Sequence, residues 1–152
     1  MALPKIEVPT YELTLPSEDK QVKYRPFLVK EEKILMMALE EANDTQMKNA
    51  VIDLVNSCTF GTVSAKDMPL FDLEYLFLNI RAKSIGEVAE FRVFCPKDKV
   101  TLIPVEIDLT KVEVQVDDAH TNNVVLDEDR KLGIVLKYPT ISTVPMGVDI
   151  EK

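Results

Sequence analysis

The sequence has few of the residues from which enzymes build compact catalytic and phosphate-binding sites. Its 152 residues include four glycines, one histidine, two cysteines and no tryptophan. It contains no G-x-S-x-G nucleophile elbow, no glycine-rich phosphate loop and no H-E-x-x-H metal motif. We therefore expect a protein that is not an enzyme and that carries no cofactor.

Long apolar runs are also missing. The longest ones fall well below the roughly 18 residues that a membrane-spanning helix needs. Pro4, Pro9 and Pro16 interrupt the first residues in a way that is unlike a secretory leader. Because the two cysteines, Cys58 and Cys95, also lie far apart in the sequence, we expect a reduced, cytosolic protein.

Positive charge is scarce relative to negative charge. Eighteen basic and 26 acidic residues give a formal net charge of -8. A field of this sign repels nucleic-acid phosphates and anionic lipid head groups. We therefore expect neither nucleic acid nor a membrane as the partner.

The few residues that could take part in catalysis lie in positions that do not favour a catalytic site. His120 lies in the polar segment DDAHTNN without a neighbouring nucleophile, which indicates a solvated loop residue. Cys58 lies on the apolar face of a predicted helix and is interpreted as a core residue. The acidic clusters lie at helix ends and in turns, whereas a general acid and base pair needs burial to shift its pKa.

Hydrophobic periodicity predicts a hairpin followed by a helical zone. Apolar and polar residues alternate in YELTLP and QVKYRPFLV, which predicts two strands joined by a turn within residues 1–28. Helical spacing then predicts helices over residues 30–43, 45–58 and 70–86, with Thr45 as a cap and Gly86 at the last end. The expected core residues are Met47, Val51, Leu54, Val55 and Cys58 on the second helix, and Phe71, Tyr75, Leu78 and Ile80 on the third.

From Glu87 onward the period changes to two. This predicts strands in VAEFRVF, KVTLIPVEIDL, KVEVQV and KLGIVLKYP, with Pro104 marking an edge or a bulge. The fold class is therefore α+β, with an N-terminal β-hairpin, about three helices and then a mainly antiparallel β-sheet. With 46% hydrophobic residues, we expect one domain over residues 1–139, with the hairpin and the helices over residues 1–86 and mostly β structure over 87–139. Residues 140–152 are expected to be a linker or the start of a missing C-terminal helical part.

The stretch EFRVFCPKDK, residues 90–99, has the outline of the first knuckle of a zinc ribbon. A structural zinc site needs four ligands, commonly from two C-x-x-C pairs. Here Asp98 stands three residues after Cys95 and no further cysteine follows, so the knuckle is degenerate and we expect no bound metal. Pro96 and Asp98 instead favour a hairpin turn.

Four segments together resemble the baseplate hub assembly protein family of T4-like bacteriophages: YRPFLVKEEKILMMALE, IRAKSIGEVAEFRVFCP, VEIDLTKVEVQV and GIVLKYPT. The resemblance spans the chain from about Pro4 to Pro139. In relatives the strand after the RAKS(V/I)GE element often ends in C-x-x-C, where this chain has Asp98. The resemblance implies a non-enzymatic tail assembly factor, or chaperone, that helps to build the central baseplate hub in the host cytoplasm through contacts with other hub or hub-assembly proteins.

The segment YRPFLVKEEK allows two interpretations. A structural junction between a strand and a helix explains most of it, because Pro26 fixes the direction of the chain and Phe27 staples the helix start to the core. Alternatively, Tyr24, Arg25 and Phe27 form a patch that contacts a partner, a residue mix that is favoured at interface anchors.

Two classes of function therefore stay open. The first is the phage assembly factor that the resemblance implies. The second is a degenerate zinc-ribbon module that binds a metal or nucleic acid and acts in regulation, through a basic face hidden within an acidic chain.

Overall fold

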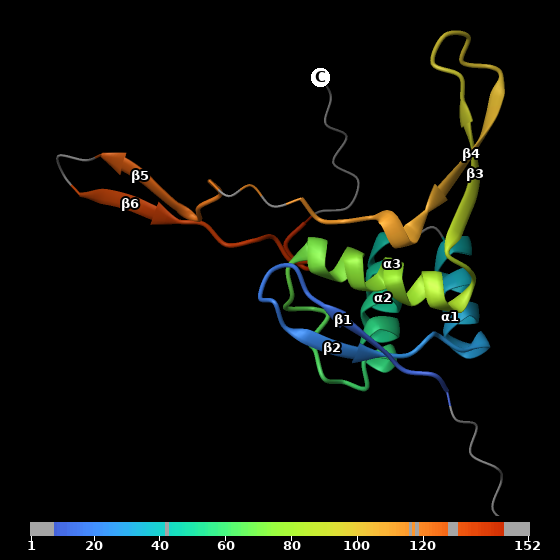
Figure 1. The fold of residues 1–152 in the computed structure, drawn as a ribbon, viewed down its shortest axis with the longest axis horizontal. Helices are drawn as coiled ribbons and strands as arrows, with labels where there is room; N and C mark the ends of the chain where they lie inside the picture. The colour runs from blue at the N-terminus through green and yellow to red at the C-terminus, as the bar shows by residue number, and fades with distance from the viewer. Residues whose placement is uncertain (1–7, 42, 116, 118, 128–130, 145–152) are drawn as a thin grey trace, which may run out of the picture.

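The computed structural model describes residues 8–41, 43–115, 117, 119–127 and 131–144. Figure 1 shows a body of helices from which two hairpins project in different directions. The elements are β1 (Tyr11–Thr14), β2 (Gln21–Tyr24), α1 (Val29–Glu40), α2 (Asp44–Cys58), α3 (Leu70–Ser84), β3 (Val88–Phe94), β4 (Leu102–Asp108), a 3-10 turn (Leu109–Lys111), β5 (Asn123–Asp127) and β6 (Leu132–Val135). The predicted α+β class is confirmed.

The helical body consists of the β1–β2 hairpin and the three helices. The predicted N-terminal hairpin is confirmed, with Tyr11 paired to Tyr24 and Thr14 paired to Gln21. Its turn is tied to the start of α3, because the buried Asp72 carboxylate accepts hydrogen bonds from the Ser17 backbone N–H, at 3.1 Å, and from the Ser17 hydroxyl.

The second helix begins differently from the prediction. Its N-cap is Asn43, not Thr45, because the Asn43 side-chain oxygen accepts from the backbone N–H groups of Thr45 and Gln46 at 3.0 and 3.3 Å. The third helix ends at Ser84, two residues before Gly86, whose φ of +148° turns the chain into β3.

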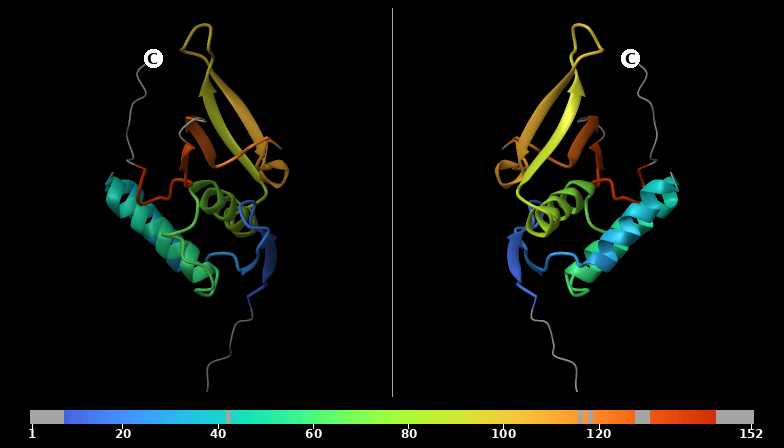
Figure 2. Two further views of the ribbon diagram at one scale, coloured as in Figure 1. Left: turned by 90° about the vertical axis from the view of Figure 1, so that its left-hand side faces the viewer. Right: turned by 90° about the vertical axis from the view of Figure 1, so that its right-hand side faces the viewer.

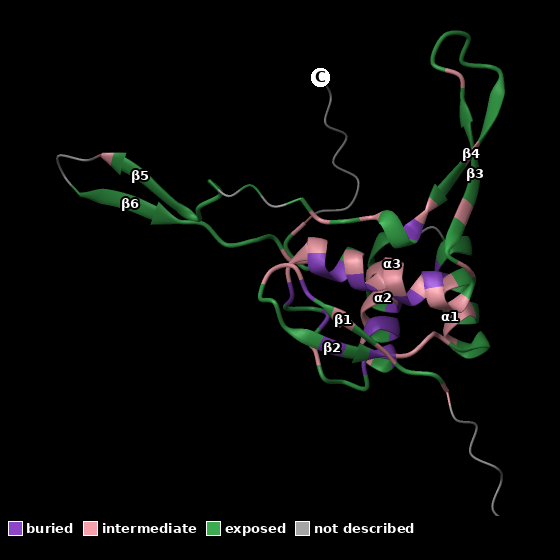
Figure 3. Cartoon of the chain, viewed as in Figure 1, coloured by how far each residue is buried: buried purple, intermediate pink, exposed green. Residues whose placement is uncertain are grey.

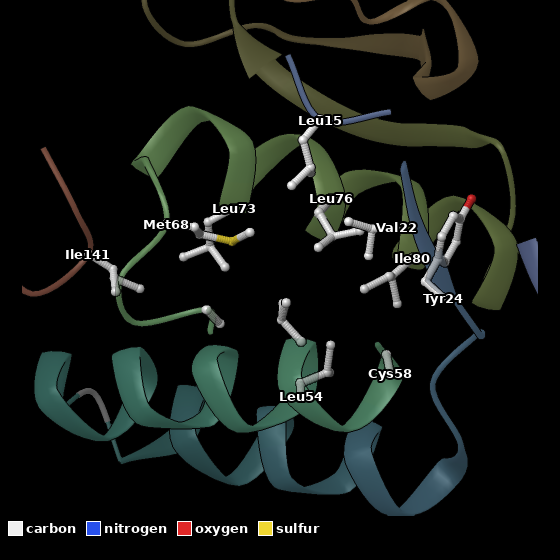
Figure 4. Close-up of a cluster of buried hydrophobic side chains, with 12 residues drawn as sticks. Leu15, Val22, Tyr24, Leu54, Cys58, Met68, Leu73, Leu76, Ile80 and Ile141 are labelled. Carbon is white, nitrogen blue, oxygen red and sulfur yellow. The ribbon is translucent and has the colours of Figure 1, made fainter. Parts of the chain in front are cut away.

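The core lies between α2, α3 and the β1–β2 hairpin (Figure 4). Ile80 belongs to it as predicted, whereas Phe71, Tyr75 and Leu78 are only partly buried. The other buried apolar residues of α3 in this core are Leu73 and Leu76. Helix α3 carries apolar residues around most of its circumference, so its hydrophobic period did not define which side faces inward. On α2, Leu54, Val55 and Cys58 are confirmed as core residues.

The strands after the helices form separate hairpins and not a continuous sheet. In the described parts of the chain, β3 pairs with β4 and β5 pairs with β6, both antiparallel. Residues 112–115 of the predicted strand KVEVQV form no strand, whereas NVVLD, which was not among the predicted strands, is β5. Alternation makes a strand possible, but a pairing partner decides which alternating segments become strands.

After β6 the chain returns to the body. Leu70 donates its backbone N–H to the carbonyl of Pro139 at 2.9 Å, and Ile141 lies in the core. The Lys48 ammonium donates to the Val144 carbonyl at 2.6 Å. The domain boundary at residue 139 stays a prediction, and residues 145–152 of the predicted linker lie outside the described part.

Candidate protein-contact surface on the β-hairpins

The β3–β4 hairpin, called here the first arm, has one entirely apolar face. Residues directly paired across an antiparallel ladder lie on the same face, and successive residues alternate between faces. The pairs Ala89–Ile107, Phe91–Val105 and Val93–Ile103 therefore share one face. The opposite face is mixed and carries Glu90, Arg92, Glu106 and Asp108 together with Val88, Phe94, Leu102 and Pro104.

Within the described residues, little covers this apolar face. Phe91 is 42% exposed and Ile103 is 40% exposed, and Val93 and Ile107 are also exposed. Figure 2 shows the first arm standing clear of the helices from two further directions, and Figure 3 shows it as almost entirely exposed. Contiguous exposed apolar surface of this kind marks interaction sites in soluble proteins.

The β5–β6 hairpin, called here the second arm, exposes apolar residues on both faces. Val124 pairs with Ile134, and Val125 pairs with Gly133, before a bulge between Val125 and Asp127. Its apolar side chains are between 37% and 68% exposed: Val124, Val125, Leu126, Leu132, Ile134 and Val135. Two arms of one chain therefore present uncovered apolar surface.

Asp98 lies in the turn at the tip of the first arm, three residues after Cys95, and its hydrogen bonds hold this turn together. The Asp98 carboxylate accepts from the Thr101 hydroxyl at 2.5 Å and from the N–H groups of Val100 and Thr101 at 3.1 Å each. The hydroxyl bond first, and then the two N–H bonds, lower the pKa of Asp98 to about 2. Asp98 therefore acts as a turn-forming residue.

The structure does not confirm the zinc-ribbon-like part of the predicted fold. Across the described residues, no three side chains of histidine, cysteine, aspartate or glutamate gather as a metal site would require. The absence of a bound metal stays a prediction.

The strand-to-helix junction places Arg25 and Glu31 together. The Arg25 guanidinium donates to Glu31 at 2.8 Å, and the second oxygen of Glu31 accepts from the backbone N–H of Leu28 at 2.6 Å. Burial acts to raise the pKa of Glu31, but the hydrogen bonds from Arg25 and Leu28 outweigh it and hold the pKa below its usual value. This contact ties β2 to the first turn of α1.

The candidate contact residues of this junction face the inside of the body. Tyr24 is only 3% exposed and belongs to the core, and Phe27 packs against that core. The Phe27 backbone N–H donates to the Ser84 hydroxyl at 2.9 Å. A partner would therefore reach little of Tyr24 without rearranging the body, and a contact role for Tyr24, Arg25 and Phe27 stays a prediction.

His120 is exposed, as expected of a loop residue, but it is not isolated. Its ring stacks on Tyr138 with 5.8 Å between centroids, and its Nε2 lies 2.9 Å from the Tyr138 hydroxyl. Tyr138 in turn meets the edge of Phe71 at 5.0 Å. This stack, beside a hollow of about 380 Å³, attaches the base of the second arm to α3. Local sequence patterns do not predict this contact, since 18 residues separate His120 from Tyr138.

Cys58 is confirmed as a core residue. It is fully buried, and burial raises the pKa of its thiol to about 11. The Arg25 guanidinium lies 3.9 Å from the sulfur, and the Arg25 backbone N–H donates to the Cys58 carbonyl at 2.9 Å. These contacts hold β2 against the end of α2.

No described helix is long and apolar enough to cross a membrane. A family model with the description T4 bacteriophage base plate protein matches residues 8–151, which is nearly the whole chain. Neither the curated proteins nor the solved structures contain a match.

Proposed function

The chain belongs to the T4 bacteriophage base plate protein family, and on this premise we propose that it is a non-enzymatic assembly factor for the central hub of the phage baseplate. It acts in the host cytoplasm and binds hub or hub-assembly proteins, with the apolar face of the first arm as its contact surface.

The exposed apolar face of the first arm is the observation that supports this proposal. A two-stranded hairpin is marginally stable alone in water and normally packs against a further element. Here the face of Phe91, Val93, Ile103 and Ile107 has no such cover in the described structure. A hub component that packs on this face would stabilise the arm and bury apolar surface at the same time.

Two neighbouring residues of β4 provide a matched test. Ile103 and Leu102 are 40% and 47% exposed, but they lie on opposite faces of the first arm. Each variant, Ile103→Ser and Leu102→Ser, is co-expressed with tagged candidate hub proteins, and the amount that co-purifies is measured. We expect Ile103→Ser to lose most of the associated hub protein and Leu102→Ser to retain it.

The opposite pattern, or equal losses in both variants, would show that the apolar face is not the contact. Failure of the unmodified chain to associate with any hub protein would count against the assembly role itself. Circular dichroism of each variant checks that the helical body is intact.

A further inference from the structure

The outer edge of β3 offers a complete row of free backbone groups. At the two ends of the ladder, Cys95 donates to the Thr101 carbonyl and Leu109 donates to the Glu87 carbonyl, both at 2.8 Å. Because bonded and non-bonded pairs alternate along an antiparallel ladder, the odd-numbered residues of β3 bond to β4. Val88, Glu90, Arg92 and Phe94 therefore direct their N–H and C=O groups outward, where the described chain supplies no backbone partner.

The outer edge of β4 is interrupted. Pro104 pairs with Arg92, so it occupies a non-bonded pair and its nitrogen lies on the outer edge. Proline has no N–H to donate, and prolines at this position are one way in which proteins prevent pairing at a sheet edge. An added strand would therefore bind along β3.

The charges on β3 suit a second copy of β3. In an antiparallel pair with Phe91 opposite Phe91, Glu90 of each copy faces Arg92 of the other, and Val88 faces Phe94. Sliding the copies to either neighbouring register places Glu90 opposite Glu90, or Arg92 opposite Arg92, and like charges directly opposite destabilise a ladder. One register alone therefore combines the free edge with opposite charges.

The first arm also leaves Glu90 and Arg92 available for this pairing. Both side chains are exposed, and neither forms an ion pair within the described residues. Glu90 faces Glu106 across the hairpin, a like-charge pair that Arg92 of a second copy would offset.

The rest of the arm does not oppose association. Between residues 88 and 108 it carries three basic side chains (Arg92, Lys97, Lys99) and four acidic ones (Glu90, Asp98, Glu106, Asp108), whereas the whole chain carries a net charge of -8. One of the acidic side chains, Asp108, pairs with Lys111 of the following 3-10 turn at 3.0 Å. The arm is thus a nearly neutral segment that projects from an acidic molecule (Figure 1).

From these observations we propose that the chain forms a homodimer by antiparallel pairing of β3 with β3 of a second copy, Phe91 opposite Phe91. The product is a four-stranded sheet in the order β4, β3, β3, β4. Pairing in this register places the apolar faces of both arms on the same side of the sheet. The dimer does not depend on the proposed hub role.

Charge reversal tests the register. In Glu90→Arg both cross-strand pairs join two arginines, and in Arg92→Glu both join two glutamates. We expect each variant alone to raise the dimer dissociation constant about tenfold or more in sedimentation equilibrium. Mixing the two variants restores both opposite-charge pairs, so the mixture should form a heterodimer about as tightly as the unmodified chain.

Loss of the dimer in both variants with recovery on mixing cannot come from misfolding, because two misfolded chains would not form a dimer when they are mixed. A chain that is monomeric at all concentrations, or dimers unaffected by either reversal, would overturn the proposal. A mixture that stays monomeric would overturn the register. Ile103→Ser lies on β4, away from the paired edge, and should keep the dimer even where hub association is lost, so the two proposals fail separately.

Discussion

The helical body and the first arm use similar apolar residues in opposite ways. In the body, Leu76 and Ile80 are completely buried between α2, α3 and the β1–β2 hairpin. In the first arm, Phe91 and Ile103 form a continuous apolar face that stays in contact with water. The body therefore buries its apolar side chains internally, whereas the described structure leaves the apolar face of the first arm exposed.

This difference in burial predicts that the body determines the stability of the chain and that the first arm determines its association with other proteins. Buried apolar area contributes roughly 25 cal/mol per Å² to folding, so most of the stability of the chain comes from the body. The first arm is held mainly by its own ladder and by the 3-10 turn, where Leu109 is buried. Changes in the body should alter folding, and changes in the arm should alter association.

The largest expected effect is a loss in the stability of the helical body. Leu76→Ala removes a completely buried side chain from the core, which should lower the free energy of unfolding by about 3 kcal/mol because a cavity is left behind. Ile103→Ala, on the exposed face of the first arm, should lower it by less than about 1 kcal/mol. Urea denaturation followed by circular dichroism measures both, and comparable losses would contradict the division between body and arm.

The sequence predicted the body better than the arms for a physical reason. A helix satisfies its backbone hydrogen bonds locally, so the spacing of apolar residues was enough to place α1, α2 and α3 within a few residues. A strand needs a partner that the sequence does not identify, and so KVEVQV was predicted as a strand while NVVLD was not.

The candidate site shows the same limit. Alternation in VAEFRVF predicted β3 correctly, and the same alternation places Ala89, Phe91 and Val93 on one face. The sequence could not show that nothing in the body covers this face, because coverage depends on where the chain travels after β4. Likewise, the turn role of Asp98 followed from residue type, whereas the contact of His120 with Tyr138 depends on the path of the second arm.

The second prediction uses the two cysteines as probes, one in each region. Cys58 is fully buried in the body and its thiol pKa is raised to about 11, whereas Cys95 at the tip of the first arm is partly exposed. The raised pKa lowers the fraction of reactive Cys58 thiolate near neutral pH. We expect a maleimide to label Cys95 rapidly and Cys58 only as the body unfolds.

Mass spectrometry of the labelled peptides measures the two rates. The variant Cys95→Ser should remove the fast phase and leave the slow one. Fast labelling of Cys58 under native conditions would mean that the end of α2 opens without global unfolding, and that the body is less closed than its burial indicates.

The smallest expected effect concerns how the stability of the body depends on pH. The pKa of Glu31 is lowered from 4.5 in the folded body, so this carboxylate contributes stability above pH 4.5 that is lost as the pH falls through its folded value. Glu31→Gln removes this contribution and should cost about 1 kcal/mol at pH 7 and progressively less toward pH 3. Asp98 has a pKa of about 2 but lies at the tip of the first arm, so Asp98→Asn should leave the urea unfolding of the body unchanged at both pH values. If Glu31→Gln costs the same at pH 7 and pH 3, the Arg25–Glu31 contact does not stabilise the body through charge.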